Sequence, residues 1–174
     1  MKSVLLMAIA ITAGLTASAQ GGGDKSKRPS PPVQAKETLK GGTVVTIDYS
    51  QPSLKGRTIG KDVEPNPGQV WRAGANEATV FEVSKPVRVQ GKELPAGKYG
   101  FFTIDNGDEW TIIFNKTYNQ WGAYEYKAAD DVLRVNAKAG KASPVAEKLT
   151  YSIGKDGKVT LSWGDKQVSF KIDG

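Results

Sequence analysis

The sequence contains no cysteine and no histidine among its 174 residues. Without cysteine, the chain has no disulfide, no thiolate nucleophile, no zinc ribbon and no lipid-modified cysteine anchor. Without histidine, it has no Ser-His or Cys-His catalytic pair and no imidazole metal site. Walker and dinucleotide-binding glycine motifs are also missing. We therefore expect no cofactor and no metal site, and we assign no catalytic residue from the sequence.

An uncharged hydrophobic run occupies residues 3–15, directly after the positive charge of Lys2. Residues 17–19 then form a small-x-small pattern, which would make Gln20 the new N-terminus after cleavage. This arrangement is typical of a secretory signal peptide, and the run is shorter than the about 20 residues that span a bilayer. We predict that residues 1–19 are a signal peptide, that the protein is exported and is periplasmic or secreted, and that no membrane anchor remains after cleavage.

Glycine, proline and charged residues dominate the segment that follows. Such a composition buries too little apolar surface to offset the ordering of the backbone, so we predict a flexible Gly/Pro-rich leader over residues 20–34. Residues 20–42 carry five basic and two acidic side chains, whereas residues 43–174 carry 18 basic and 16 acidic side chains. The folded domain therefore lacks the basic stripe of a nucleic-acid-binding protein, and we expect no nucleic acid as a partner.

Short segments of alternating hydrophobic and polar residues recur about every ten residues in the rest of the chain, which is typical of all-β domains. Val45, Ile47 and Tyr49, for example, share one face of a predicted strand. Asn106-Gly107 is a strong hairpin-turn signal. We predict an all-β fold, a single antiparallel β-sandwich of jelly-roll-like type over residues 35–174, with at most one short helix at residues 124–130. The predicted strands cover residues 33–40, 43–50, 69–72, 78–83, 85–90, 98–104, 109–115, 131–137, 149–153, 158–163 and 167–172.

Aromatic residues in these strands favour a buried inner face, because aromatic side chains fill pleated, half-buried surfaces well. The aromatic residues that we expect in the core are Trp71, Phe81, Phe101, Trp110, Phe114, Trp163 and Phe170.

Five long sequence stretches resemble those of one protein family. They are residues 46–84, 91–104, 109–116, 120–126 and 131–135, in that order. On these stretches the chain resembles the DUF2911 family of exported Bacteroidetes proteins over roughly residues 36–172. The resemblance implies a single β-rich domain after a signal peptide. It implies no catalytic residues, because the biochemical function of the family is uncharacterised.

Two polar clusters follow predicted strands, where a rigid sheet often positions functional groups on loops. In the first cluster, residues 71–79, Arg72 carries a planar guanidinium suited to a carboxylate. Its expected partner is Glu77 or Asp48 within the protein, or a ligand anion. The second cluster, residues 48–57, is either a binding loop or an irregular edge held by Asx and Ser turns.

A third cluster, residues 115–126, combines four aromatic residues with several amides. Exposed rings beside amides can form a platform for sugar rings. Alternatively, Tyr124 and Tyr126 share one face and simply pack within the fold.

These clusters favour a non-catalytic binding module for a glycan or an envelope protein partner. The first alternative is a glycosidase-like hydrolase that uses a pair of carboxylates, either Asp48 with Glu77 or Asp62 with Glu64. The second alternative is a purely structural envelope protein. The sequence does not predict the oligomeric state. The candidate ligand-binding residues are Asp48, Arg57, Trp71, Arg72, Asn76, Glu77 and Trp121.

Overall fold

The computed structural model describes residues 23–174, so the predicted signal peptide lies outside the described residues. This part of the chain forms ten strands, which pair antiparallel, and two single-turn 3-10 helices, η1 Lys25–Lys27 and η2 Ala128–Asp130. The prediction of an antiparallel all-β domain is confirmed. None of the helices in residues 23–174 is long and apolar enough to cross a membrane. The strands are β1 Pro32–Thr38, β2 Val44–Ser50, β3 Val70–Trp71, β4 Ala75–Val83, β5 Val87–Val89, β6 Lys92–Leu94, β7 Gly97–Asp105, β8 Glu109–Asn115, β9 Asp131–Ile153 and β10 Lys158–Asp173.

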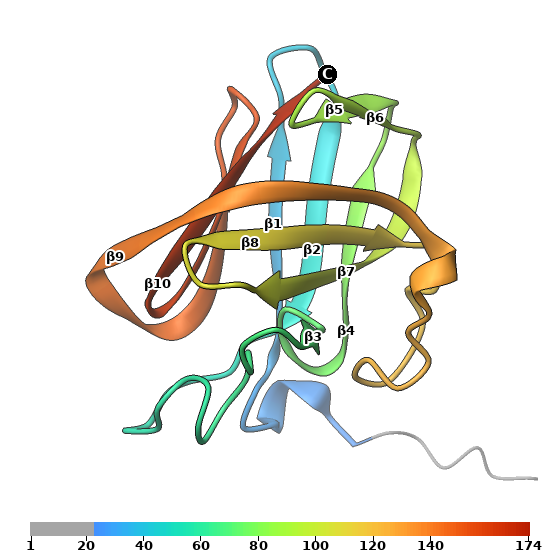
Figure 1. Ribbon diagram of the computed structural model, residues 1–174. Coiled ribbons are helices and arrows are strands. Elements are labelled where there is room, and N and C mark those ends of the chain that lie inside the picture. The colour runs from blue at the N-terminus through green and yellow to red at the C-terminus, as the bar shows by residue number, and fades with distance from the viewer. Residues whose placement is uncertain (1–22) are drawn as a thin grey trace, which may run out of the picture.

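All ten strands belong to one continuous sheet in the order β1-β2-β4-β7-β8-β9-β10-β5-β6, and β3 pairs with β7. The sheet coils back on itself, and in Figure 1 β8 and β9 cross in front of β1, β2 and β4. Phe101 on β7 and Phe170 on β10 meet across the interior with ring centroids 5.9 Å apart. The two layers expected of a sandwich are therefore two parts of a single sheet, not two separate sheets.

The two longest strands, β9 and β10, were each predicted as two shorter ones. In β10, the gap between the predicted strands 158–163 and 167–172 is a register shift within a continuous strand, where Gly164 adopts a φ of 61°. A bulge of this kind bends a strand without ending it. In β9, residues 138–148 lack a clear alternation in sequence, and they are held by pairing with β10. Strand β6 was not predicted, and it lies between the predicted strands 85–90 and 98–104.

The seven aromatic residues predicted in the core are all buried. Phe101 lies near the centre, with its ring 5.5 Å from those of Phe81 and Phe114 and 6.1 Å from that of Tyr151. Burial of each large side chain stabilises the fold by about 1.5–3 kcal/mol. This packing joins the two layers and gives a rigid base to the loops at their ends.

Three irregular segments gather at one end of the molecule. Figure 1 shows the N-terminal segment with η1, the loop 51–69 and the loop 116–127 below the ends of β2 and β4. The N-terminal segment, which was predicted as a flexible leader, is hydrogen-bonded to the domain. The carbonyl of Pro31 in this segment accepts from the backbone N–H of Gln51 at 2.9 Å. Strand β1 begins at Pro32, inside the range predicted as leader. The candidate site lies among these segments.

Candidate functional site

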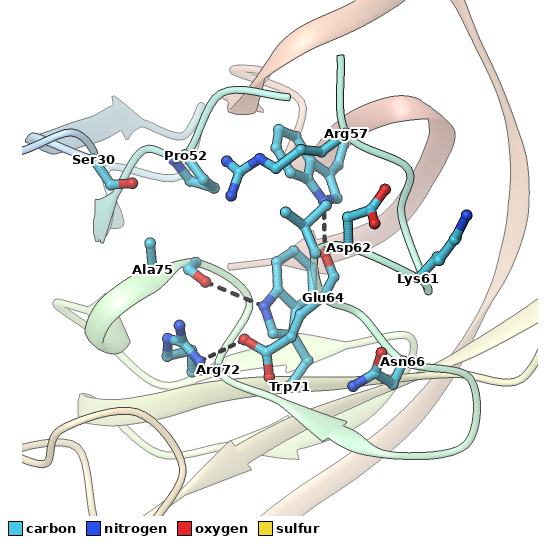
Figure 2. Close-up of a pocket in the computed structure, with 13 residues that line it drawn as sticks. Ser30, Pro52, Arg57, Lys61, Asp62, Glu64, Asn66, Trp71, Arg72 and Ala75 are labelled. Carbon is cyan, nitrogen blue, oxygen red and sulfur yellow. Dashed lines mark hydrogen bonds and ion pairs between the residues drawn. The ribbon is translucent and has the colours of Figure 1, made fainter. Parts of the chain in front are cut away.

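A cleft of about 350 Å³ opens where the loop 51–69 faces the start of β4 (Figure 2). The loop leaves the sheet because Pro52, Pro65 and Pro67 have no backbone N–H to donate to a strand ladder. It is held in place by local bonds: the carboxylate of Asp62 accepts from the backbone N–H of Thr58 at 2.9 Å. Charged side chains of both signs line the cleft, namely Arg57, Lys61, Asp62, Glu64 and Arg72.

Two buried indole rings, those of Trp71 and Trp163, form part of the lining. Each ring has its own backbone partner. The Nε1 of Trp71 donates to the carbonyl of Gly74 at 3.1 Å, and the Nε1 of Trp163 donates to the carbonyl of Glu64 at 2.8 Å. The indoles therefore hold the two walls in place, and their N–H groups are already used within the protein.

Arg72 pairs with Glu64, whose Oε2 lies 2.5 Å from the Nη1 of the arginine. The expectation that Glu77 or Asp48 would be the partner is wrong, because the loop before β3 brings Glu64 next to the residue that follows β3. The side chain of Arg72 remains 23% exposed, and its Nε is buried without a hydrogen-bond partner among the described residues. The guanidinium therefore keeps part of its donor capacity unfilled.

Arg57 lies on the opposite side of the cleft from Arg72, as Figure 2 shows. Its Nε donates to the carbonyl of Leu54 at 3.0 Å, and its Nη2 donates to the carbonyl of Ser53 at 2.8 Å. No carboxylate within residues 23–174 forms an ion pair with it. Arg57 is thus an exposed cation, positioned by its own loop and without a charged partner in the described protein.

Glu77 lies outside this cleft. The Nη1 of Arg28 approaches its two carboxylate oxygens at 2.9 and 3.1 Å, and the Nζ of Lys25 lies 2.9 Å from Oε1. Partial burial alone would raise the pKa of Glu77, but the hydrogen bonds from Arg28 and Lys25 outweigh it and lower the pKa from 4.5 to about 2. Glu77 shares a second depression of about 330 Å³ with Asp48, which accepts a 2.7 Å hydrogen bond from Gln34.

Asn76 connects the segments around the cleft. Its Nδ2 donates to the carbonyl of Ser30 at 3.0 Å, and its own carbonyl accepts from the backbone N–H of Gly122 at 2.9 Å. Trp121 forms an isolated β-bridge with Glu77, and the guanidinium of Arg28 lies 5.9 Å from the centroid of its indole ring. Asn76 therefore contacts Ser30 in the cleft wall, and neither Asn76 nor Trp121 lines the cleft.

The predicted site residues thus divide into two groups. The structure brings Arg57, Trp71 and Arg72 together in the cleft. The other four lie outside the lining of the cleft: Asp48 and Glu77 line the second depression, Trp121 bridges to Glu77, and Asn76 contacts Ser30. Ser30, Asn66 and Trp163 also line the cleft, and none of the three was predicted as a site residue from the sequence. The sequence around these residues does not mark them as part of a site, because a serine in a proline-rich segment and a tryptophan in a strand also occur in many segments that line no cleft.

The loop 116–127, here called the aromatic loop, carries Tyr118, Trp121 and Tyr124 with exposed fractions of 40%, 52% and 85%. Of Tyr124 and Tyr126, only Tyr126 packs within the fold: its ring lies 5.0 Å from that of Phe102 in the second, smaller core cluster. Burial, followed by the hydrogen bond from its hydroxyl to a neighbouring carboxylate, raises the pKa of Tyr126 to about 12. Tyr126 anchors the loop, and the other three rings face solvent.

The loop backbone is held by the buried side chain of Gln120. Its Nε2 donates to the carbonyl of Thr117 at 2.9 Å, and its Oε1 accepts from the backbone N–H of Glu125 at 3.0 Å.

Within residues 23–174, no group of three or more His, Cys, Asp and Glu side chains is arranged to hold a metal ion. The cleft and the aromatic loop together offer a ligand hydrogen-bonding groups, charged groups and the faces of aromatic rings.

The fold and the cleft define a single-domain, all-β protein with a polar cleft formed by loops at one end of a coiled sheet. The family model described as a protein of unknown function, DUF2911, matches residues 30–172, and the chain belongs to this family. No curated protein and no solved structure matches the chain.

Proposed function

We propose that this protein is a non-catalytic binding module for an acidic glycan and that the cleft holds one acidic sugar. The observation that carries the proposal is the pair of arginines, Arg57 and Arg72, on opposite walls of the cleft. A guanidinium has five N–H donors in a planar fork that matches a carboxylate, and the same donors bind hydroxyl groups. A sugar acid offers both kinds of acceptor on one ring.

The size and the remaining lining of the cleft support the same ligand class. A volume of about 350 Å³ falls at the lower end of the range of small-molecule sites, roughly 300–1,000 Å³. The hydroxyl of Ser30, the amide of Asn66 and the carboxylate of Asp62 provide groups that exchange hydrogen bonds with sugar hydroxyls. We further propose that binding takes place after export, once residues 1–19 have been removed.

Hydrolysis by a carboxylate pair is less well supported. A glycosidase needs a general acid whose pKa is raised, so that the group still carries its proton near neutral pH. Glu77 has the opposite property, because Arg28 and Lys25 keep it ionised. In the other candidate pair, Glu64 already holds Arg72. Both pairs thus have a carboxylate committed to an internal cation, which favours binding without turnover.

Calorimetric titration with digalacturonic acid and with its dimethyl ester tests the proposal, because the ester keeps the sugar rings and removes both charges. We expect the acid to bind roughly tenfold more tightly than the ester, and Arg57→Ala to remove most of that difference. Arg88→Ala is the matched control, since Arg88 is an exposed arginine on β5 and lies only 3.6 Å from Glu93. Failure of both sugars to bind would refute the proposal, and release of monosaccharide during the titration would refute its non-catalytic part.

A further inference from the structure

We infer that the aromatic loop forms a second sugar subsite next to the cleft, so that the protein binds a chain of sugars and not a single residue. This inference rests on the proposed glycan function. The structure exposes four large hydrophobic side chains within residues 23–174, and three of them, Tyr118, Trp121 and Tyr124, lie on this one loop. Such a concentration of exposed rings marks an interaction surface, since single scattered hydrophobic residues are the usual pattern.

The start of β4 connects the cleft to the aromatic loop. Ala75 lines the cleft, Asn76 bonds to the loop at Gly122, and Glu77 forms the bridge with Trp121. Ala75 and Glu77 are two residues apart on either side of Asn76, which has a φ of 57°. Two residues of chain span at most about 7 Å, so Ala75 and Glu77 lie within that distance of each other. A sugar chain that places one ring in the cleft therefore reaches Trp121 with a nearby ring.

The backbone of the aromatic loop and the ring of Trp121 are held in position before any ligand binds. Gln120 and Asn76 fix the loop backbone, and Arg28 covers one side of the Trp121 indole while its guanidinium is held by Glu77. The indole nevertheless remains about half exposed. A pre-positioned ring loses little conformational freedom on binding, so more of the contact energy appears as affinity.

The neighbours of the rings favour a glycan as the occupant. Exposed Lys116, Asn119 and Glu125 alternate with the aromatic side chains along the loop. Sugar rings present apolar C–H groups on their faces and hydroxyls at their edges, which fits aromatic surfaces flanked by polar side chains. A protein interface would instead be expected to have a contiguous apolar centre that lacks charge.

The test compares the affinities of digalacturonic acid and hexagalacturonic acid, measured by calorimetry at one ionic strength. We expect the hexamer to bind wild-type protein roughly tenfold more tightly than the dimer. In Trp121→Ala and in Tyr124→Ala, the hexamer should bind no more tightly than the dimer binds. Val145→Ala is the matched control, because Val145 is also a large exposed hydrophobic residue and lies on β9. The Val145→Ala variant should bind the hexamer more tightly than the dimer by the same factor as wild-type protein does.

Equal affinity of wild-type protein for both oligomers would overturn the inference and leave the proposed function standing. A hexamer gain that persists in both ring variants would also overturn it, because that gain would arise from the larger number of binding registers on a long chain. If wild-type protein does not bind the dimer at all, the proposed function is refuted instead. Circular dichroism of each variant confirms that the fold is retained, and Tyr124, whose side chain is 85% exposed, provides the variant with the least structural effect.

Discussion

Arg28 and Glu77 are 49 positions apart in the sequence and form a two-point ion pair, with the Nη1 of Arg28 at 2.9 and 3.1 Å from the two carboxylate oxygens. The pair attaches the N-terminal segment to β4. It also positions Ser30, two residues after Arg28, in the wall of the cleft. A segment whose composition predicts a flexible leader is in this way part of the candidate site.

The first prediction concerns the pH dependence of stability. In the unfolded chain the pKa of Glu77 is near 4.5, and in the folded protein it is about 2. The ion pairs of Glu77 therefore stabilise the fold fully above pH 4.5, and this stabilisation is lost as the pH falls from 4.5 to about 2. Glu77→Gln should lower the free energy of unfolding by about 1 kcal/mol at pH 7, a value kept small because the pair is partly solvent-screened.

Urea denaturation of wild type and Glu77→Gln across this pH range measures the effect. The difference in unfolding free energy between the two proteins should shrink below pH 4.5 and vanish as the pH falls below about 2. Glu93→Gln is the control, because Glu93 is largely exposed and lies 3.6 Å from Arg88. If the difference in unfolding free energy between wild type and Glu77→Gln were the same at every pH, the ion pairs of Glu77 would not be its cause.

The second prediction concerns the aromatic core. Phe101→Ala should lower the free energy of unfolding by about 3–5 kcal/mol, because the lost ring leaves a cavity between the two layers. Denaturant unfolding checks the value, with Val145→Ala expected to change stability by less than about 0.5 kcal/mol. A small effect at Phe101 would mean that the layers do not depend on this contact.

The third prediction compares two tryptophans that are each 1% exposed, Trp163 and Trp110. Trp163 donates a hydrogen bond to Glu64, whereas the Nε1 of Trp110 has no partner among the described residues. Trp163→Phe should therefore destabilise the protein by about 1–3 kcal/mol more than Trp110→Phe, since only the former leaves a carbonyl unpaired. Equal losses in thermal or urea unfolding would contradict this role of the indole.

The fourth prediction concerns Gly100 on β7, which allows the aromatic loop to approach the sheet closely. A Cβ at this position would lie 2.6 Å from the carbonyl oxygen of Thr117 and 2.7 Å from the ring of Phe102. Gly100→Ala should cost about 1–3 kcal/mol through overpacking and should displace the loop.

Urea unfolding and hexagalacturonate titration together test this displacement. Gly140→Ala is the control, since a Cβ there would meet only the carbonyl oxygen of Gln167 at 3.8 Å. If Gly100→Ala had wild-type stability and hexamer affinity, close approach of the loop would not be required.

Local patterns in the sequence predicted most of the strands, because alternation of side chains along a strand is a property of neighbouring residues. The class of the fold and the buried aromatic residues follow from such patterns. Strand β9 shows the limit: its residues 138–148 have no clear alternation and are set by pairing with β10. The joining of two layers into one sheet is likewise a long-range property.

The candidate site was predicted in part. Arg57, Trp71 and Arg72 were identified because polar residues after a strand end on loops. The partner of Arg72 was not identified, because it is the path of the loop 51–69, and not closeness in sequence, that brings Glu64 to Arg72. The contribution of Arg28 had no local signal, because only the folded protein places it next to Glu77.

Strand β9 has a consequence for how the molecule comes apart. Its first residues, up to Lys138, pair with β8, and the residues from Ala139 onward pair with β10. β9 thus belongs to both layers, and opening either layer removes the pairing partners of one part of this strand. Heat or denaturant should melt the whole domain in a single cooperative transition, and the backbone amides around Ala137 should be among the last to exchange with deuterium.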